Sequence, residues 1–233
     1  MTQPSLGILM LKTRFPRPPG DVGNPDTWPF PVVRQVVEAA TVDRVVNADP
    51  PVDLLLKPFV AGGQALVDAG AAAITTTCGF LAVFQDDLTQ ALPVPVLASS
   101  LQQAPLVQRS LPRGKRVGII SIDAGNLSSR HLAAAGVDPD TPVVGTEQGR
   151  ELSRIILDDL EELDVAKAEA DILKAGDALA AKAPELGAVV LECANMAPYS
   201  RALAQQLGVP VYDIVTMITW LHAGLAPRLW PNA

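Results

Sequence analysis

The strongest constraint on how this chain can fold is an internal repeat. Residues 84–99 (FQDDLTQALPVPVLAS) align without gaps on residues 199–214 (YSRALAQQLGVPVYDI) at a shift of 115 positions, with six of sixteen residues identical. Composition alone would give roughly one or two identities. The same shift places Cys78 on Cys193, the two cysteines of the sequence. The repeat therefore predicts two similar halves, each with one cysteine at the same place.

A second repeat lies upstream, where Leu6-Gly7-Ile8-Leu9 resembles Val117-Gly118-Ile119-Ile120 at a shift of 111 residues. The alternative is that any two strand–helix units share Val-Pro-Val turns and that both cysteines are only small buried residues. The equivalent placement of both cysteines argues against this alternative.

Apolar patterning predicts strands and helices that alternate along the whole chain. Short apolar runs predict strands at residues 6–11, 44–47, 71–77, 94–99, 117–121, 142–145, 188–191 and 209–213. Helical spacing predicts helices at residues 32–40, 54–69, 80–92, 101–111, 151–163, 167–183 and 199–207. Alternation of this kind is typical of parallel sheets with crossover helices.

The expected fold class is therefore α/β, with two pseudo-symmetric flavodoxin-like αβα units and an active site in the cleft between them. We expect residues 1–100 to form the first unit, completed by a C-terminal helix within 211–233. Residues 101–210 should form the second unit.

Charge and composition exclude several kinds of partner. The net charge is −7, the isoelectric point is about 4.8, and Lys and Arg form no basic stripe, so a nucleic acid is not expected. No stretch approaches the roughly 20 apolar residues that span a bilayer, so we expect no membrane partner and a cytoplasmic location. The sequence has no P-loop, no GxGxxG and no cluster of His and Cys, so no cofactor or metal is expected.

Each cysteine follows a predicted strand and precedes a predicted helix. The segments are Ile74-Thr75-Thr76-Thr77-Cys78-Gly79 and Val190-Leu191-Glu192-Cys193-Ala194-Asn195. Ligands of parallel sheets bind at the carboxyl ends of the strands, and the positive end of the following helix favours a thiolate and an anionic substrate. Two thiols on opposite sides of one carbon can remove a proton and return one, which predicts two-base racemisation with catalytic Cys78 and Cys193.

With these residues, the chain resembles the cofactor-independent aspartate/glutamate/hydantoin racemase superfamily, which also contains maleate isomerase and arylmalonate decarboxylase. Residues 14–25 and the segment Thr77-Cys78-Gly79-Phe80-Leu81 are similar to a subgroup known only as the aspartate/glutamate racemase family. The resemblance implies a cofactor-independent racemase or isomerase that acts on a small carboxylate with an acidic Cα–H. Whether the protein forms a homodimer stays open.

The chain departs from better-known members around both cysteines. Amino-acid racemases typically have Asn-Thr after the first cysteine and Thr after the second, whereas Gly79-Phe80 and Ala194-Asn195 stand here. Glutamate racemases have an acid after the first strand, where this chain has Lys12-Thr13-Arg14. Arylmalonate decarboxylase keeps only the second cysteine. Two alternatives therefore stay open: a cysteine nucleophile in cis–trans isomerisation or decarboxylation of a small dicarboxylate, or a non-enzymatic sensor of small acids.

Further candidate residues follow from their places on the strands and loops. The expected substrate-binding residues are Arg14, Thr77, Gly79, Ser121, Ala194 and Asn195. Arg17 is a second cation after the first strand, and Glu192 is either a base that tunes a thiol or a rim residue. Residues 20–31 predict either a lid or a packed surface loop. His131 and His222 are expected to be structural or exposed.

Overall fold

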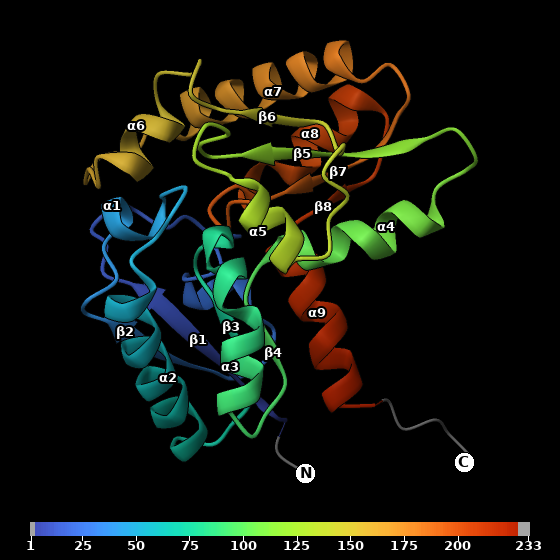
Figure 1. The fold of residues 1–233 in the computed structure, drawn as a ribbon. Helices are drawn as coiled ribbons and strands as arrows, with labels where there is room; N and C mark the ends of the chain where they lie inside the picture. The colour runs from blue at the N-terminus through green and yellow to red at the C-terminus, as the bar shows by residue number, and fades with distance from the viewer. Residues whose placement is uncertain (1–2, 228–233) are drawn as a thin grey trace.

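Two four-stranded parallel sheets form the centre of the computed structural model, which describes residues 3–227 (Figure 1). The first sheet has the order β2-β1-β3-β4, with β1 (Ser5–Leu11), β2 (Val32–Val37), β3 (Ala71–Thr76) and β4 (Val96–Leu97). The second has the equivalent order β6-β5-β7-β8, with β5 (Arg116–Ser121), β6 (Val143–Gly145), β7 (Leu186–Leu191) and β8 (Val211–Tyr212). The predicted α/β fold with parallel sheets is confirmed.

The sequence repeat corresponds to a structural one. Strands β3 and β4 lie 115 residues before β7 and β8, and β1 starts 111 residues before β5, as the two sequence shifts predict. The pairing irregularity also repeats: Ser5 pairs with Ala71 and Leu6 with Ala73, while Arg116 pairs with Leu186 and Val117 with Ala188. The two halves therefore share topology and register.

Helices cover both sheets. In the first half these are α1 (Val42–Val45), α2 (Val52–Asp68), the 3-10 helix η2 (Gly79–Phe84) and α3 (Gln85–Ala91). In the second half they are η3 (Ser100–Gln103), α4 (Ala104–Ser110), α5 (Ser129–Ala134), α6 (Leu152–Leu157), α7 (Val165–Lys182), η4 (Ala197–Tyr199) and α8 (Ser200–Leu207). A short 3-10 helix, η1 (Pro25–Thr27), lies between β1 and β2.

The last described helix, α9 (Ile214–Leu225), runs from the second half to the first sheet (Figure 1). Its residues Ile214 and Met217 share an apolar cluster with Leu6, Ile8 and Ala73 of the first sheet. Residues 211–212, expected in the first unit, instead form β8 and pair with β7 of the second sheet. Residues 228–233 of the expected C-terminal helix lie outside the described residues.

Two predicted elements near residue 40 are wrong. Residues 32–37, predicted as the start of a helix, form strand β2, because all six pair with residues 6–11 of β1 and four of them are valines, which favour strands. Residues 44–47, predicted as a strand, contain the end of α1, which starts after Thr41. Helix α2 continues through Pro58, and its Gly62 and Gly63 let it approach Leu9 and Leu92, because a Cβ at either glycine would crowd those side chains.

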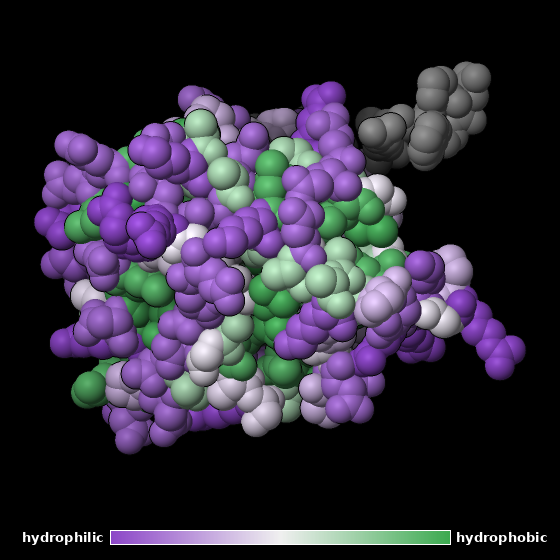
Figure 2. Space-filling model, turned by 90° about the horizontal axis from the view of Figure 1, so that it is seen from above, coloured by the Kyte–Doolittle hydropathy of each residue, from purple (hydrophilic) through white to green (hydrophobic). Residues whose placement is uncertain are grey.

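Hydrophilic residues cover most of the face on the side of α7, with hydrophobic residues interspersed (Figure 2). None of the helices in residues 3–227 combines the length and apolar character needed to cross a bilayer.

Candidate active site

Cys78 and Cys193 line the same cavity, one from each half. Cys78 follows β3 and immediately precedes η2, and Cys193 stands two residues after the end of β7. Both are free cysteines, 7% and 4% exposed. The cavity has a volume of about 10 Å³, roughly the space of one water molecule. Its lining residues are Leu11, Phe15, Arg17, Val42, Val46, Thr77, Cys78, Ile122, Ile156, Cys193 and Asn195.

The surroundings of both thiols oppose their ionisation. Burial, followed by the nearby Glu192 carboxylate, raises the pKa of both thiols well above the usual range. The backbone N–H groups of Phe80 and Leu81 at Cys78, and of Asn195 at Cys193, lower the thiol pKa as expected for a helix start, but loss of solvent raises it more. The segments after the cysteines are 3-10 helices of three to six residues, which present only a weak dipole.

A buried polar chain connects the loop after β1 with Cys193. The Arg17 guanidinium, 12% exposed, donates to Asp21 at 2.9 Å, and Asp21 is 1% exposed. Asn195 Nδ2 donates to the other oxygen of Asp21 at 2.6 Å, and Cys193 Sγ lies 3.4 Å from Asn195 Oδ1. Arg17 also lies over the Phe15 ring, 4.7 Å from its centre. These hydrogen bonds hold the Arg17 guanidinium and the Asn195 amide at the cavity wall.

Asp21 is the member of this polar chain that sequence reasoning missed. An acidic residue four positions after Arg17, within a loop of turn-forming residues, is the signal that could have indicated it. Its burial depends on the second half of the protein, which supplies Asn195.

Glu192 lies beside both cysteines in the interior. One carboxyl oxygen accepts hydrogen bonds from Ser121 Oγ at 2.9 Å and from the Ile122 N–H at 3.3 Å. Burial raises the pKa of this carboxyl to about 7 in spite of both hydrogen bonds. A Cβ added to Gly79 would overlap the other carboxyl oxygen and the Glu192 carbonyl, so only glycine fits there. Gly79 and Ser121 therefore contact Glu192.

The other expected substrate-binding residues lie at different distances from the cavity. Thr77 and Asn195 line it, and Thr77 Oγ1 accepts a hydrogen bond from the Leu11 N–H at 3.1 Å. Ala194 is buried in the apolar cluster beneath α9 rather than at the cavity.

Arg14 does not line the cavity. Its guanidinium pairs with Asp159 and Glu161 of the second half, and Asp159 Oδ1 also accepts the Arg14 N–H at 2.6 Å and the Phe15 N–H at 3.3 Å. Its guanidinium therefore joins the two halves, and Arg17 is the arginine that lines the cavity with the cysteines. Phe15, next to Arg14, and Ile156, three residues before Asp159, both line the cavity, so Arg14 and Asp159 connect the two halves at its rim.

Residues 20–31 pack closely against the protein. Trp28 is buried and donates from Nε1 to the Val22 carbonyl at 2.9 Å, while Phe30 stacks on His222 at 3.6 Å. Gly20 has a φ of 97° and approaches the backbone of Pro198. This is the arrangement of a packed surface loop.

Both histidines lie outside the cavity lining. His222 contacts the Pro4 carbonyl through Nε2. His131 is fully buried, accepts the Ser128 N–H at Nδ1 and lies edge-on to Phe80, and burial lowers its pKa to about 4. Nowhere within residues 3–227 do three or more His, Cys, Asp or Glu side chains gather as a metal site would require.

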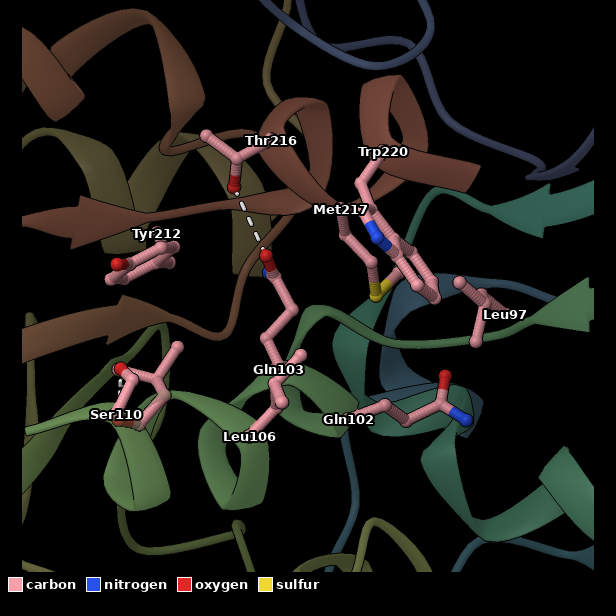
Figure 3. Close-up of a pocket in the computed structure, with 10 residues that line it drawn as sticks. Leu97, Gln102, Gln103, Leu106, Ser110, Tyr212, Thr216, Met217 and Trp220 are labelled. Carbon is pink, nitrogen blue, oxygen red and sulfur yellow. Dashed lines mark hydrogen bonds between the residues drawn. The ribbon is translucent and has the colours of Figure 1, made fainter. Parts of the chain in front are cut away.

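A larger groove of about 470 Å³ lies between α4 and α9 (Figure 3), and neither cysteine lines it. Its lining residues are Leu97, Gln102, Gln103, Leu106, Val107, Ser110, Tyr212, Thr216, Met217 and Trp220. Among these described residues none carries a charge or a thiol, so the groove offers no acid–base group with a pKa near neutrality. The candidate active site is the small cavity at the cysteines.

Sequence comparison shows that nearly the whole chain is similar to known enzymes. The chain is 27% identical over 238 residues to a dimethylsulfoniopropionate lyase of Durusdinium sp. clade D, covering 98% of this chain and 78% of the relative. It is 25% identical to dimethylsulfoniopropionate lyase 5 of Emiliania huxleyi (strain CCMP1516), covering 94% of this chain. The chain spans only 45% of the length of that second relative.

Solved structures and a family model agree on the fold. The crystal structure of arylmalonate decarboxylase superposes with a TM-score of 0.63 at 17% identity, covering 96% of this chain and 93% of that one. The model described as Asp/Glu/Hydantoin racemase matches residues 52–222, which include both cysteines. The chain belongs to the Asp/Glu/hydantoin racemase family.

Proposed function

We propose that this protein is a cofactor-independent enzyme that transfers a proton at the carbon next to the carboxylate of a small acid, with Cys78 and Cys193 as the acid–base pair. The observation that carries this proposal is that the two cysteines, from equivalent places in two halves, line one cavity. Racemisation is the overall reaction that such a pair supports most directly.

The proposed reaction has two balanced steps. One cysteine, as thiolate, takes the Cα proton, so that an S–H bond forms and the C–H electron pair moves into the carboxylate. The other cysteine, as thiol, gives its proton to the opposite face of the resulting planar carbon. The two cysteines have then exchanged protonation states, and the enantiomer is released.

The cavity lining supports binding of a small acid that has one carboxylate and is otherwise apolar. Arg17 is the cation at the wall, and Thr77 and Asn195 add polar groups beside it. The other lining residues besides the cysteines are apolar: Leu11, Phe15, Val42, Val46, Ile122 and Ile156. An acid with one carboxylate and small apolar substituents fits this lining better than a dicarboxylate, whose second charge would lose its solvent without a partner.

The relatives favour a second candidate, a lyase reaction that begins with the same proton abstraction. In dimethylsulfoniopropionate the carbon β to the carboxylate carries a sulfonium, which is a leaving group. With such a substrate, the C–H electron pair can form a C=C bond after proton abstraction. The sulfide then departs with the electrons of the C–S bond. This candidate needs one thiolate, so the second cysteine would serve only to protonate or to bind.

One experiment separates the candidates. The protein is incubated in D₂O with single enantiomers of small 2-substituted acids and, separately, with dimethylsulfoniopropionate, a malonate and a maleate, and the mixtures are followed by NMR and chiral chromatography. Deuterium at Cα together with the opposite enantiomer supports the racemase. Release of dimethyl sulfide supports the lyase. Product from a malonate or a maleate without Cα exchange supports decarboxylation or cis–trans isomerisation instead, and no reaction across the panel contradicts the enzymatic proposal.

A further inference from the structure

Two buried thiols need a further group to accept a proton before either of them can act as a base. Proton abstraction needs one thiolate, yet both thiols lie in a nearly dry cavity in which ionisation is costly. The proton that leaves the first thiol must have an acceptor within the site. Among the described residues, the carboxylates near the thiols are Asp21 and Glu192.

Asp21 cannot easily be that acceptor, because its oxygens are already occupied. They accept hydrogen bonds from Arg17 at 2.9 Å, from the Gly23 N–H at 2.7 Å and from Asn195 at 2.6 Å. Protonation of Asp21 would leave Arg17 without its counter-charge in the interior.

Glu192 has the opposite arrangement. Its Oε2 accepts from Ser121 and the Ile122 N–H, but its Oε1 is buried and has no hydrogen-bond partner among the described residues. A buried carboxyl oxygen without a partner is rare, and it is a free acceptor for one proton.

The position of Oε1 is fixed by both halves of the protein. Ser100 Oγ donates to the Glu192 carbonyl at 2.9 Å, and Oε1 lies so close to Gly79 that a Cβ there would overlap it. Gly79 directly follows Cys78, and Glu192 directly precedes Cys193. One carboxyl therefore stands next to one cysteine in space and next to the other along the chain.

We infer that Glu192 is the internal proton acceptor that lets Cys78 become a thiolate. The Cys78 S–H bond breaks and an O–H bond forms at Glu192 Oε1, directly or through one water molecule, and the proton returns at the end of the cycle. The step converts a thiol and a carboxylate into a thiolate and a carboxylic acid. The net charge of the buried site does not change, so no additional ion has to be desolvated.

Cys78 is the cysteine that this step favours, because its surroundings stabilise a thiolate better. The N–H groups of Phe80 and Leu81 and the Arg17 guanidinium all act to lower its pKa, whereas Cys193 faces the negative charge of Asp21 as well as that of Glu192. The charged groups that act on Glu192 itself are few: Asp123 raises its pKa, and the other influences are the hydrogen bonds from Ser121 and Ile122. This role rests on the proposed function of the cysteine pair, but it can be tested without a substrate.

The test measures the alkylation rate of each cysteine by iodoacetamide between pH 5.5 and 9.5, resolved by peptide mass spectrometry. A proton shared between Cys78 and Glu192 gives the wild-type Cys78 rate a rise near pH 7 and then a plateau, because the thiolate fraction is constant once the pair has lost its first proton. In Glu192→Gln the plateau should disappear, so the Cys78 rate should equal the wild-type rate below about pH 6.5, keep rising with pH, and exceed the wild-type rate about tenfold at pH 8.

A carboxylate that stays ionised and acts only through its charge gives a different result. Removal of this permanent charge would lower the pKa of each thiol, so Glu192→Gln would react faster than wild type by the same factor at every pH, and the wild-type rate would rise without a plateau. That result overturns the inference and leaves the cysteine chemistry intact. If Glu192→Gln does not fold, the presence or absence of a plateau in the wild-type profile is sufficient to test the inference. The matched control, Glu162→Gln, removes an exposed carboxyl on the loop before α7 and should reproduce the wild-type profile.

Discussion

Asn195 Nδ2 donates a hydrogen bond of 2.6 Å to Asp21 Oδ2, across 174 positions of sequence. This bond joins the loop after β1 of the first half to the loop that carries Cys193 in the second. Arg17 neutralises the same carboxylate and lines the cavity. The cation proposed to bind the substrate carboxylate is thus held in place by residues of both halves.

This relationship predicts the effect of Asp21→Ala. The substitution leaves the Arg17 guanidinium buried without its counter-charge, and removal of one partner of a buried pair typically costs about 3 kcal/mol or more. The free energy of unfolding, measured by urea titration, should fall by about that amount. Asp26→Ala, in the same loop but exposed, should change it by less than about 0.5 kcal/mol. Equal effects of the two substitutions would contradict the role given to Asp21.

The two-base mechanism predicts that each cysteine deprotonates a different enantiomer. Cys78→Ala and Cys193→Ala should each reduce racemisation by at least about 10²-fold, because each variant lacks one of the two bases. With a substrate that carries a leaving group on the β-carbon, each variant should still eliminate that group from one enantiomer, since elimination needs no second proton. Chiral chromatography of the residual substrate should show opposite preferences. The same preference in both variants would refute the two-base mechanism.

Gly79→Ala should disturb the site more than its size suggests. The new Cβ would overlap Oε1 and the carbonyl oxygen of Glu192, and relief of such overpacking typically costs about 1–3 kcal/mol. The melting temperature should fall, and catalysis with it. Gly224→Ala in α9 is the matched control, because a Cβ there meets open space and alanine favours the helix, so its melting temperature should be unchanged or slightly higher.

The burial of Glu192 predicts a dependence of stability on pH. Its pKa is raised from 4.5 to about 7 in the folded protein, so between these values the folded state binds more protons than the unfolded chain. The Glu192 contribution to the unfolding free energy therefore falls as the pH rises from 4.5 to 7, by about 3 kcal/mol in total, and is constant above that. Other carboxyls have their own slopes, so the measurement is the difference between wild type and Glu192→Gln in denaturant titrations at pH 5 and pH 8. Glu192→Gln should gain stability relative to wild type at pH 8, and a difference independent of pH would show that Glu192 is not buried as described.

The contact between Arg14 and Asp159 predicts control of access to the cysteines. The cavity holds roughly one water molecule, so a substrate enters only when its walls separate. Asp159→Ala removes the acceptor of the Arg14 and Phe15 N–H groups at the rim, so alkylation of both cysteines should become several-fold faster. Glu185→Ala breaks the comparably exposed pair with Arg116 away from the cavity and should leave the rates unchanged. If both substitutions accelerate alkylation equally, general loosening rather than the rim contact is responsible.

Strand periodicity and the repeat were sufficient to predict the parallel α/β halves, because side-chain burial on a sheet follows local pattern and the repeat fixes which strands correspond. Local pattern failed at residues 32–37, where Val-Val-Arg-Gln-Val-Val fits a helix or a strand. Pairing with β1 decided between them. No periodicity within the segment contains that information, because the partner strand lies more than twenty residues away.

The sequence by itself determined that Cys78 and Cys193 occupy equivalent strand ends, since their common shift of 115 residues follows from the repeat. Only the tertiary structure decided the chemistry around them. It paired Arg14 with Asp159 and directed Arg17 and Asp21 to the cysteines, because those choices depend on loops of the opposite half. It also removed solvent from the thiols and from Glu192. Protonation depends on the solvent and charge that surround a group in space, which the order of residues along the chain does not specify.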